Sequence, residues 1–202
     1  MGSERNTALG NSTVSRVSRS ECELLYTLAR GVPVGQVIVS LSSGEDEAAT
    51  WLARGTNGAT GRKVHSVNTR DANYEPMSWR WKEQIGLLWY AASCEYEDVG
   101  KALLSWQRRL SPEAKVVLRG YDQPGVARVI REYIGSYGNF VFVDSVGATA
   151  VLAIDRCVHY WVIDYNEFGI CKYCGRKRDF KRLRSWSSEI ETKKRVNGRK
   201  NK

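Results

Sequence analysis

The stretch at residues 37–53, VIVSLSSGEDEAATWLA, decides the fold that the sequence predicts. An apolar run breaks there into a turn of small residues and resumes at helical spacing, which is typical of a strand, a tight turn and a helix. Such a junction points backbone N–H groups and a helix N-terminus at whatever lies above the strand end, and this suits an anionic or nucleotide-like ligand. The alternative is an ordinary strand–helix connection, because a turn with one glycine is weak evidence for a site.

Further strand and helix patterns follow along the chain. A helix at residues 20–29, with Ser20 as its N-cap, is predicted to lead into the first strand. Strand and helix patterns then alternate four times and end in two strands that pair. This order predicts an α/β fold, with a Rossmann-like, mostly parallel sheet and helices on both faces. The predicted strands are 37–41, 63–67, 85–92, 115–118, 140–144 and 149–154, and the later helices are 45–54, 96–110 and 126–134.

Three phrases within residues 20–154 resemble class I S-adenosylmethionine-dependent methyltransferases, most closely the branch related to cephalosporin-hydroxylase and small O-methyltransferases. The phrases are VSLSSGEDEAATWLA, LLWYAASCEYEDV and LSPEAKVVLRGYDQPGV, in the family's order and at matching spacing. Ligands of open α/β sheets bind at the carboxyl ends of the strands. The resemblance therefore implies S-adenosylmethionine as a cofactor, bound by Ser42, Ser43, Gly44 and Asn68.

Several positions depart from the family's pattern in ways that weaken the implied site. Ser40, Ser42 and Asp46 stand where the family has an acid and two glycines. A carboxylate beside the cofactor's carboxylate would repel it, and a Cβ at a close-approach glycine would crowd it. Asn68 replaces the acid that would hold the ribose hydroxyls. The segment AASC replaces an acid-rich segment and RG replaces a His-Asp pair, so no two carboxylates remain together for a divalent cation.

These departures predict a methyltransferase-like scaffold with an eroded cofactor and catalytic site. No residue is assigned as catalytic, because the rim offers no obvious group for general acid–base chemistry. Two alternatives stay open. One is an active S-adenosylmethionine-dependent methyltransferase with an altered pocket and an unknown substrate, and the other is a non-enzymatic scaffold or assembly protein.

A second constellation follows the last predicted strand, in the sequence RCVHYWVIDYNEFGICKYCGRKRDF. Cys157 and His159 form one close pair and Cys171 and Cys174 another, on either side of a predicted hairpin with a strand at 160–163 and a turn at 166–169. Two thiolate or imidazole pairs supply the four ligands that tetrahedral Zn²⁺ requires. A site closed by four protein ligands predicts a structural zinc knuckle, and the segment also resembles short zinc-ribbon-like tails. The alternatives are buried free cysteines with a chance CxxC, or a redox CxxC.

The positive charge of the chain is concentrated at its C-terminal end. Residues 175–202 hold 12 Lys or Arg and 3 acidic residues, so this segment alone accounts for the formal net charge of +9. Basic residues interleaved with aromatic ones favour binding to nucleic acid or another polyanion. A solubilising tail, or a helix docked on its own domain, is the alternative. The candidate residues are Arg176, Lys177, Arg178, Lys181, Arg182 and Arg184.

Composition sets the broad class of the protein. The chain has 202 residues, with 42% apolar and 10% aromatic content, which excludes a chiefly disordered protein. No apolar run approaches the roughly 20 residues of a membrane helix, and the first residues lack a signal-peptide core. A soluble cytoplasmic protein is expected, and nothing predicts its oligomeric state. The predicted parts are a flexible leader at 1–18, a methyltransferase-like domain at 19–155, a zinc-knuckle segment at 156–180 and a basic tail at 181–202.

Overall fold

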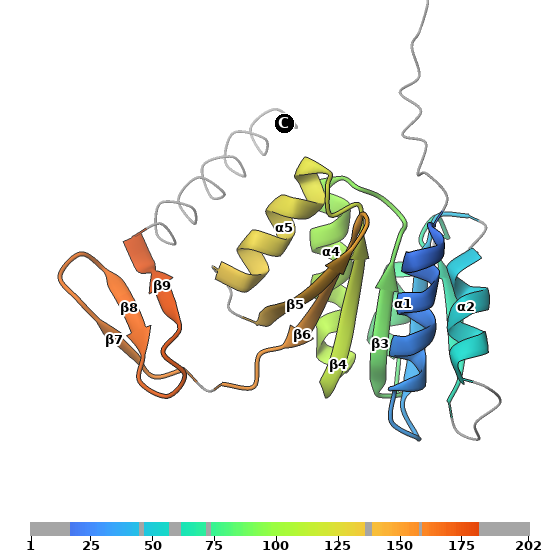
Figure 1. Cartoon of the computed structure of the whole chain (residues 1–202), viewed down its shortest axis with the longest axis horizontal. Coiled ribbons are helices and arrows are strands. Elements are labelled where there is room, and N and C mark those ends of the chain that lie inside the picture. The colour runs from blue at the N-terminus through green and yellow to red at the C-terminus, as the bar shows by residue number, and fades with distance from the viewer. Residues whose placement is uncertain are drawn as a thin grey trace, which may run out of the picture.

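The computed structural model describes residues 17–44, 47–56, 62–71, 74–135, 139–157 and 159–181. This part of the chain forms a six-stranded sheet with helices on both faces, followed by a separate three-stranded sheet (Figure 1). The helices are α1 (Arg19–Arg30), α2 (Glu47–Thr56), α3 (Tyr74–Arg80), α4 (Tyr96–Trp106) and α5 (Pro124–Gly135). The strands of the large sheet are β1 (Val37–Ser42), β2 (Val64–Asn68), β3 (Ile85–Tyr90), β4 (Leu110–Arg119), β5 (Phe140–Val146) and β6 (Thr149–Ile154).

The large sheet has the strand order β2-β1-β3-β4-β6-β5. The first four strands are parallel, and β6 runs antiparallel to both of its neighbours. The predicted α/β fold, with a mostly parallel sheet, is therefore confirmed, as is the predicted pairing of the last two strands, which is antiparallel. Because the chain moves outward from β1 to β2 and returns to the other side at β3, the order reverses between β1 and β3. The carboxyl ends of these two strands are where an open α/β sheet binds ligands.

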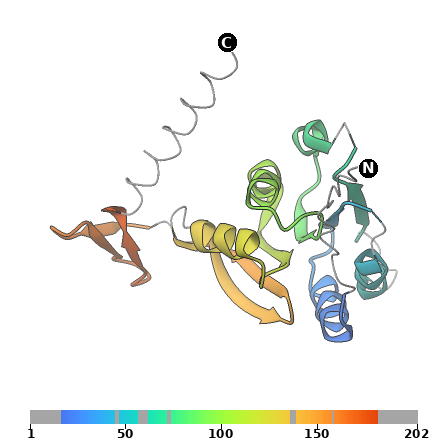
Figure 2. The same cartoon turned by 90° about the horizontal axis from the view of Figure 1, so that it is seen from above.

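Alternating side chains of the central strands bury two cores, one on each face of the sheet. In β1, Val39 and Leu41 pack toward α4 and α5, whereas Ile38 packs toward α1 and α2. Figure 2 shows these two pairs of helices on opposite sides of the sheet. All six residues of β1 and all six of β3 are buried, as expected for strands covered on both faces.

Several helices and strands differ from the bounds predicted from the sequence. The first helix is capped by Ser18 and not by Ser20, because the Ser18 hydroxyl accepts from the Glu21 N–H and the Glu21 carboxylate accepts from the Ser18 N–H. The predicted helix at 96–110 ends at Trp106, since Leu110 already pairs with Ile85 as the first residue of β4. Helix α3 was not predicted. The first two residues of the predicted helix at 45–54 lie outside the described part of the chain.

Glu21 is a buried carboxylate that joins the start of α1 to the β5–β6 hairpin. Its Oε1 accepts a hydrogen bond of 2.7 Å from Thr149 Oγ1, and its Oε2 accepts one of 2.8 Å from the Ser18 N–H. Desolvation raises the pKa of this carboxyl, but these hydrogen bonds and the charge of Arg119 outweigh it, so the pKa lies below its ordinary 4.5. The ionised form is therefore the one that stabilises the fold.

We expect Glu21→Gln to lower the free energy of unfolding at pH 7 by about 1.5–3 kcal/mol, the range for hydrogen bonds to a charged group. A carboxyl whose pKa falls on folding contributes stability above its unfolded pKa, and this contribution is lost as the pH falls through 4.5 and below. Urea unfolding at pH 7 and at acid pH measures both effects. The control is Glu23→Gln, which removes an exposed pair with Arg19 and should cost less than about 1 kcal/mol. An equal loss for Glu21→Gln at both pH values would contradict the assignment.

The second sheet consists of β7 (Trp161–Ile163), β8 (Phe168–Cys171) and β9 (Lys177–Asp179), all antiparallel. The predicted strand near 160–163 is confirmed. The predicted turn at 166–169 begins earlier, because Asp164 Oδ1 accepts from the N–H groups of Asn166 and Phe168. Strand β9 was not predicted, since its sequence, KRD, was interpreted as part of the basic segment. Figures 1 and 2 show this sheet at the opposite end of the molecule from α1 and α2.

Candidate functional site

Four side chains of the C-terminal part converge on one point. The segment after β6 supplies Cys157 and His159, strand β8 ends in Cys171, and the following turn supplies Cys174. One ligand atom from each residue lies within 4.8 Å of all the others. The sulfurs of Cys157 and Cys171 lie 3.7 Å apart, and the Cys174 sulfur lies 3.5 Å from Nδ1 of His159. Three sulfurs and one imidazole nitrogen at these distances could surround a single metal ion.

The turn from Cys171 to Gly175 is shaped to support thiolates. Gly175 has φ 70°, and its N–H donates to the Cys171 carbonyl at 2.9 Å, which closes the turn. Desolvation raises the pKa of Cys171, but the backbone N–H groups of Cys174 and Tyr173 and the His159 side chain donate to its sulfur and lower the pKa to about 6. Desolvation and the neighbouring thiols raise the pKa of Cys157 to about 12. The Cys171 thiol therefore ionises readily, whereas the Cys157 thiol would need a nearby cation to ionise at neutral pH.

Asp155 orients the imidazole of this cluster. Its Oδ2 lies 2.8 Å from His159 Nε2, so the opposite ring nitrogen, Nδ1, faces the thiols. Arg176 donates to the same carboxylate oxygen, and the side chains of Asp155 and His159 are less than one-tenth exposed. A carboxylate behind a ligating histidine is the usual outer partner in metal sites. Asp155 was not predicted, although an acid four residues before a candidate ligand is a signal for such a partner.

The other two cysteines lie outside this cluster. Cys22 is buried in α1, and Cys94 lies partly buried at the carboxyl edge of the sheet. Burial raises the pKa of both thiols. Both are therefore expected to stay protonated and unligated.

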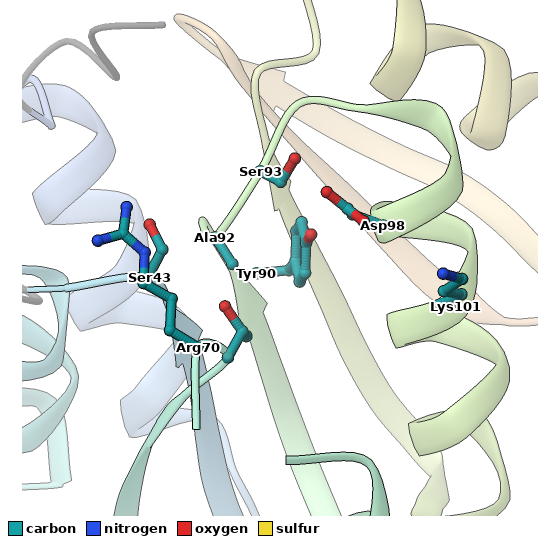
Figure 3. Close-up of a pocket in the computed structure, with 8 residues that line it drawn as sticks. Ser43, Arg70, Tyr90, Ala92, Ser93, Asp98 and Lys101 are labelled. Atoms are coloured by element: carbon teal, nitrogen blue, oxygen red, sulfur yellow. The ribbon is translucent and has the colours of Figure 1, made fainter. Parts of the chain in front are cut away.

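A cavity of about 410 Å³ opens at the carboxyl ends of β1, β2 and β3, where the strand order reverses. Figure 3 shows Arg70 rising beside Ser43 on one side, with Asp98 and Lys101 projecting from α4 on the other. Tyr90 forms the floor between them. The lining residues are Ser43, Thr69, Arg70, Tyr90, Ala92, Ser93, Asp98 and Lys101.

The predicted cofactor residues divide into two groups. Ser43 lines the cavity, and Gly44 lies next to it with open space where a Cβ would stand. The side chains of Ser42 and Asn68 instead form hydrogen bonds to nearby backbone groups. The Ser42 hydroxyl donates to the Gly44 carbonyl, and the Asn68 side chain accepts from the Arg70 N–H. Asp46 lies outside the described residues.

The charge of the cavity comes from residues that sequence analysis did not select. Arg70 and Lys101 are basic, and Asp98 is the one acid among the described lining residues. Arg70 follows β2 in a turn, and the other two occupy successive turns of α4. In the sequence these three charged residues are indistinguishable from ordinary surface residues. They come together only in the folded chain.

The residues predicted to bind nucleic acid fall into two groups, those that contact other side chains of the chain and those that are exposed. Arg176 contacts Asp155, and the Arg178 guanidinium lies 4.8 Å from the centroid of the Trp161 ring. Burial lowers the pKa of Arg178, with a further contribution from Arg176. Lys177 and Lys181 are exposed. The remaining candidates, Arg182 and Arg184, lie outside the described residues.

Comparison with solved structures places this fold among methyltransferases. The chain matches the O-methyltransferase TomG from Streptomyces achromogenes, solved in complex with SAM, at 18% identity and a TM-score of 0.53, over 69% of this chain and 81% of that one. A methyltransferase from Geobacter sulfurreducens matches at 18% identity and a TM-score of 0.47, over 70% and 80%. The fold assignment rests on the first match. A scan of protein-family models gives no match, and neither does a search of curated proteins.

The α/β part of the chain therefore has a Rossmann-like methyltransferase fold. Identity at this level establishes the fold alone, so the activity of the chain has to be argued from its own residues. Among the residues described, no helix has both the length and the apolar character to cross a bilayer.

Proposed function

We propose that this chain is a methyltransferase-like protein with an altered cofactor pocket, weak or absent catalysis, and a C-terminal sheet held by one structural Zn²⁺. The observation that carries the metal assignment is the convergence of Cys157, His159, Cys171 and Cys174, with their ligand atoms within 4.8 Å of one another. Three thiols and an imidazole match the preference of zinc for tetrahedral sulfur and nitrogen ligands. A site with four protein ligands leaves no open position for substrate, so the metal would stabilise the fold and not catalyse a reaction.

The small sheet needs such support because its own strands bury little. β7 and β9 have three residues each, and β8 has four. Segments of this size cannot obtain enough stability from apolar burial alone. Metal binding would provide that stability and fix the turn that leads into β9.

The chemistry of the cavity supports weakened catalysis. Asp98 is the one acid among its described lining residues, so no second carboxylate is in place there to share a divalent cation. Ser42 and Asn68, at the positions implied to bind cofactor, form hydrogen bonds within their own turns. We propose that S-adenosylmethionine binds weakly, through Ser43, Gly44 and the N-terminus of α2.

Isothermal titration with S-adenosylmethionine tests this part of the proposal. The expected result is affinity weaker than micromolar, together with no methyl transfer above background. The control variant Ala92→Trp places an indole in the cavity, so any binding heat that survives it comes from elsewhere on the protein. Micromolar affinity that is lost in Ala92→Trp would overturn the eroded site and favour the alternative, an active methyltransferase with an unknown substrate.

We further propose that the basic C-terminal segment binds nucleic acid. Its support is the concentration of the whole formal charge of +9 in residues 175–202. Binding to a DNA or RNA oligonucleotide should weaken as salt rises, because each neutralised phosphate releases counterions. Deletion of residues 182–202 should reduce the affinity strongly. Unchanged binding after this deletion would remove the tail from the proposal and favour the alternative of a scaffold whose partner is another protein.

A further inference from the structure

The outer face of the β7–β8–β9 sheet is apolar and uncovered. Pairing places Val162 opposite Ile170 and Ile170 opposite Lys177, so these three side chains form one row across the sheet. Val162 is 58% exposed and Ile170 48% exposed. Exposed apolar residues gathered on one small sheet mark an interaction surface more often than isolated ones do.

Aromatic rings and lysines extend this row at the end nearest the metal centre. Tyr160, directly before β7, is 56% exposed, and Tyr173, in the turn after β8, is 71% exposed. Their ring centroids lie 6.3 Å apart, and Lys172 Nζ lies 6.0 Å from the Tyr160 centroid. We define the aromatic–lysine face by these residues and the row above: Tyr160, Val162, Ile170, Lys172, Tyr173 and Lys177.

The opposite face of the sheet is already occupied by the chain itself. Trp161 packs against Phe180 with ring centroids 5.6 Å apart, and its ring lies 4.7 Å from that of His159. Arg178 covers the same indole. The inner face is therefore covered around Trp161, beside the Cys/His cluster, whereas the row of Val162, Ile170 and Lys177 on the outer face is open.

The charges around the aromatic–lysine face are not evenly placed. Lys172 and Lys177 lie at the end with the two tyrosines, whereas Asp164 and Glu167 lie in the hairpin at the other end. Asp179, opposite Phe168, is also toward the hairpin end. A ligand with flat apolar groups and a chain of negative charges would match the tyrosine–lysine end and avoid the hairpin.

We propose that the aromatic–lysine face binds single-stranded nucleic acid, with bases stacked on Tyr160 and Tyr173 and phosphates neutralised by Lys172 and Lys177. Stacking on exposed rings with cations alongside is the general mode of single-strand binding. A duplex keeps its base faces covered, so it cannot use the rings in this way. This inference rests on the proposed nucleic-acid function and names the surface that performs it.

Fluorescence anisotropy with the full-length chain tests this inference, using a labelled oligothymidylate of about 15 nucleotides and a duplex of equal length. The single strand should bind more tightly than the duplex. Tyr160→Leu and Tyr173→Leu should each weaken single-strand binding about 30-fold, the middle of the range for loss of one base stack, and should leave duplex binding unchanged. Lys172→Gln should reduce the slope of log affinity against log salt by roughly 0.7.

The matched control is Tyr165→Leu, which removes a ring that is 93% exposed but lies in the hairpin at the far end. Its affinity should equal that of the parent chain. Equal zinc content and circular dichroism in all variants show that the sheet is intact. If the Tyr160 and Tyr173 variants bind like the parent while deletion of 182–202 abolishes binding, the aromatic–lysine face is not the binding surface. Nucleic acid then binds through the basic tail alone. If the parent chain binds neither oligonucleotide at low salt, both proposals fail.

Discussion

A Cys171→Ser variant is expected to purify without zinc and to lose the β7–β8–β9 sheet, while the six-stranded sheet stays folded. Cys171 is 1% exposed, lies 3.7 Å from the Cys157 sulfur and receives the backbone hydrogen bonds of its turn. A serine hydroxyl does not ionise at neutral pH and cannot replace the thiolate. Structural zinc sites supply about 10–16 kcal/mol of binding free energy in small domains, far more than three short strands can provide.

Two measurements check this expectation. Metal analysis of protein purified without chelator should give about one equivalent of zinc for the parent chain and almost none for the variant. Hydrogen exchange should then show loss of protection in β7 and β8 and retained protection in β1 and β3. The control Cys94→Ser changes a cysteine outside the cluster and should keep its zinc. A Cys171→Ser protein with full zinc and full protection would contradict the metal centre.

The convergence of Cys157, His159, Cys171 and Cys174 was predictable because their spacing is a local property. A CxxC turn followed by glycine places two sulfurs within reach of each other whatever the rest of the chain does. The outer partner Asp155 was not predictable in the same way. Asp155 directly follows β6. Only the path of the chain from the large sheet to His159 brings its carboxylate behind the imidazole. Arg176, interpreted from the sequence as a nucleic-acid contact, turns out to face this carboxylate.

The large sheet was predictable where its strands are buried on both faces. The runs that became β1 and β3 are almost purely apolar, and both were located to within two residues at their ends. The start of β4 was missed because Ser111, Pro112 and Glu113 have a turn-like composition. Their strand conformation depends on the parallel pairing of Leu110 with Ile85, which is a long-range contact that no local pattern encodes.

The cavity shows the limit of reasoning from a family pattern. The pattern selected Ser42 and Asn68 by position, yet both side chains satisfy backbone groups of their own turns. The groups that face the cavity, Arg70, Asp98 and Lys101, come from a turn and from one face of α4. Their charges favour a ligand with at least one anionic group, which a carboxylate or a phosphate would supply.

Asp155 contacts both the large sheet and the segment that carries the Cys/His cluster, so it connects the two parts of the chain. Its N–H donates to the Asn139 carbonyl at 2.9 Å, at the entry to β5, and its side chain holds His159 and Arg176 in the small sheet. The next residue, Arg156, pairs with Glu113 in β4 at 3.0 Å. The Cys157–His159–Cys171–Cys174 cluster is thus attached to the large sheet through one short segment.

Asp155→Asn is expected to weaken zinc binding about 10- to 100-fold, the usual effect of changing an outer partner of a ligating histidine. The carboxylate fixes the imidazole with Nδ1 toward the thiols and increases its basicity, whereas an amide has no charge to do so. Arg176 would also lose its ionic partner. Competition with a chromophoric chelator measures the affinity directly.

The control that separates ligand orientation from attachment of the segment is Glu113→Gln. This change removes the exposed ion pair with Arg156 but touches neither His159 nor Arg176. Its zinc affinity should stay within about fivefold of the parent, because an exposed pair contributes less than about 1 kcal/mol. If Asp155→Asn and Glu113→Gln weaken zinc binding equally, the effect belongs to the attachment of the segment, and the assignment of Asp155 as the residue that orients His159 is wrong. If only Asp155→Asn weakens it, the carboxylate acts on the metal through the imidazole.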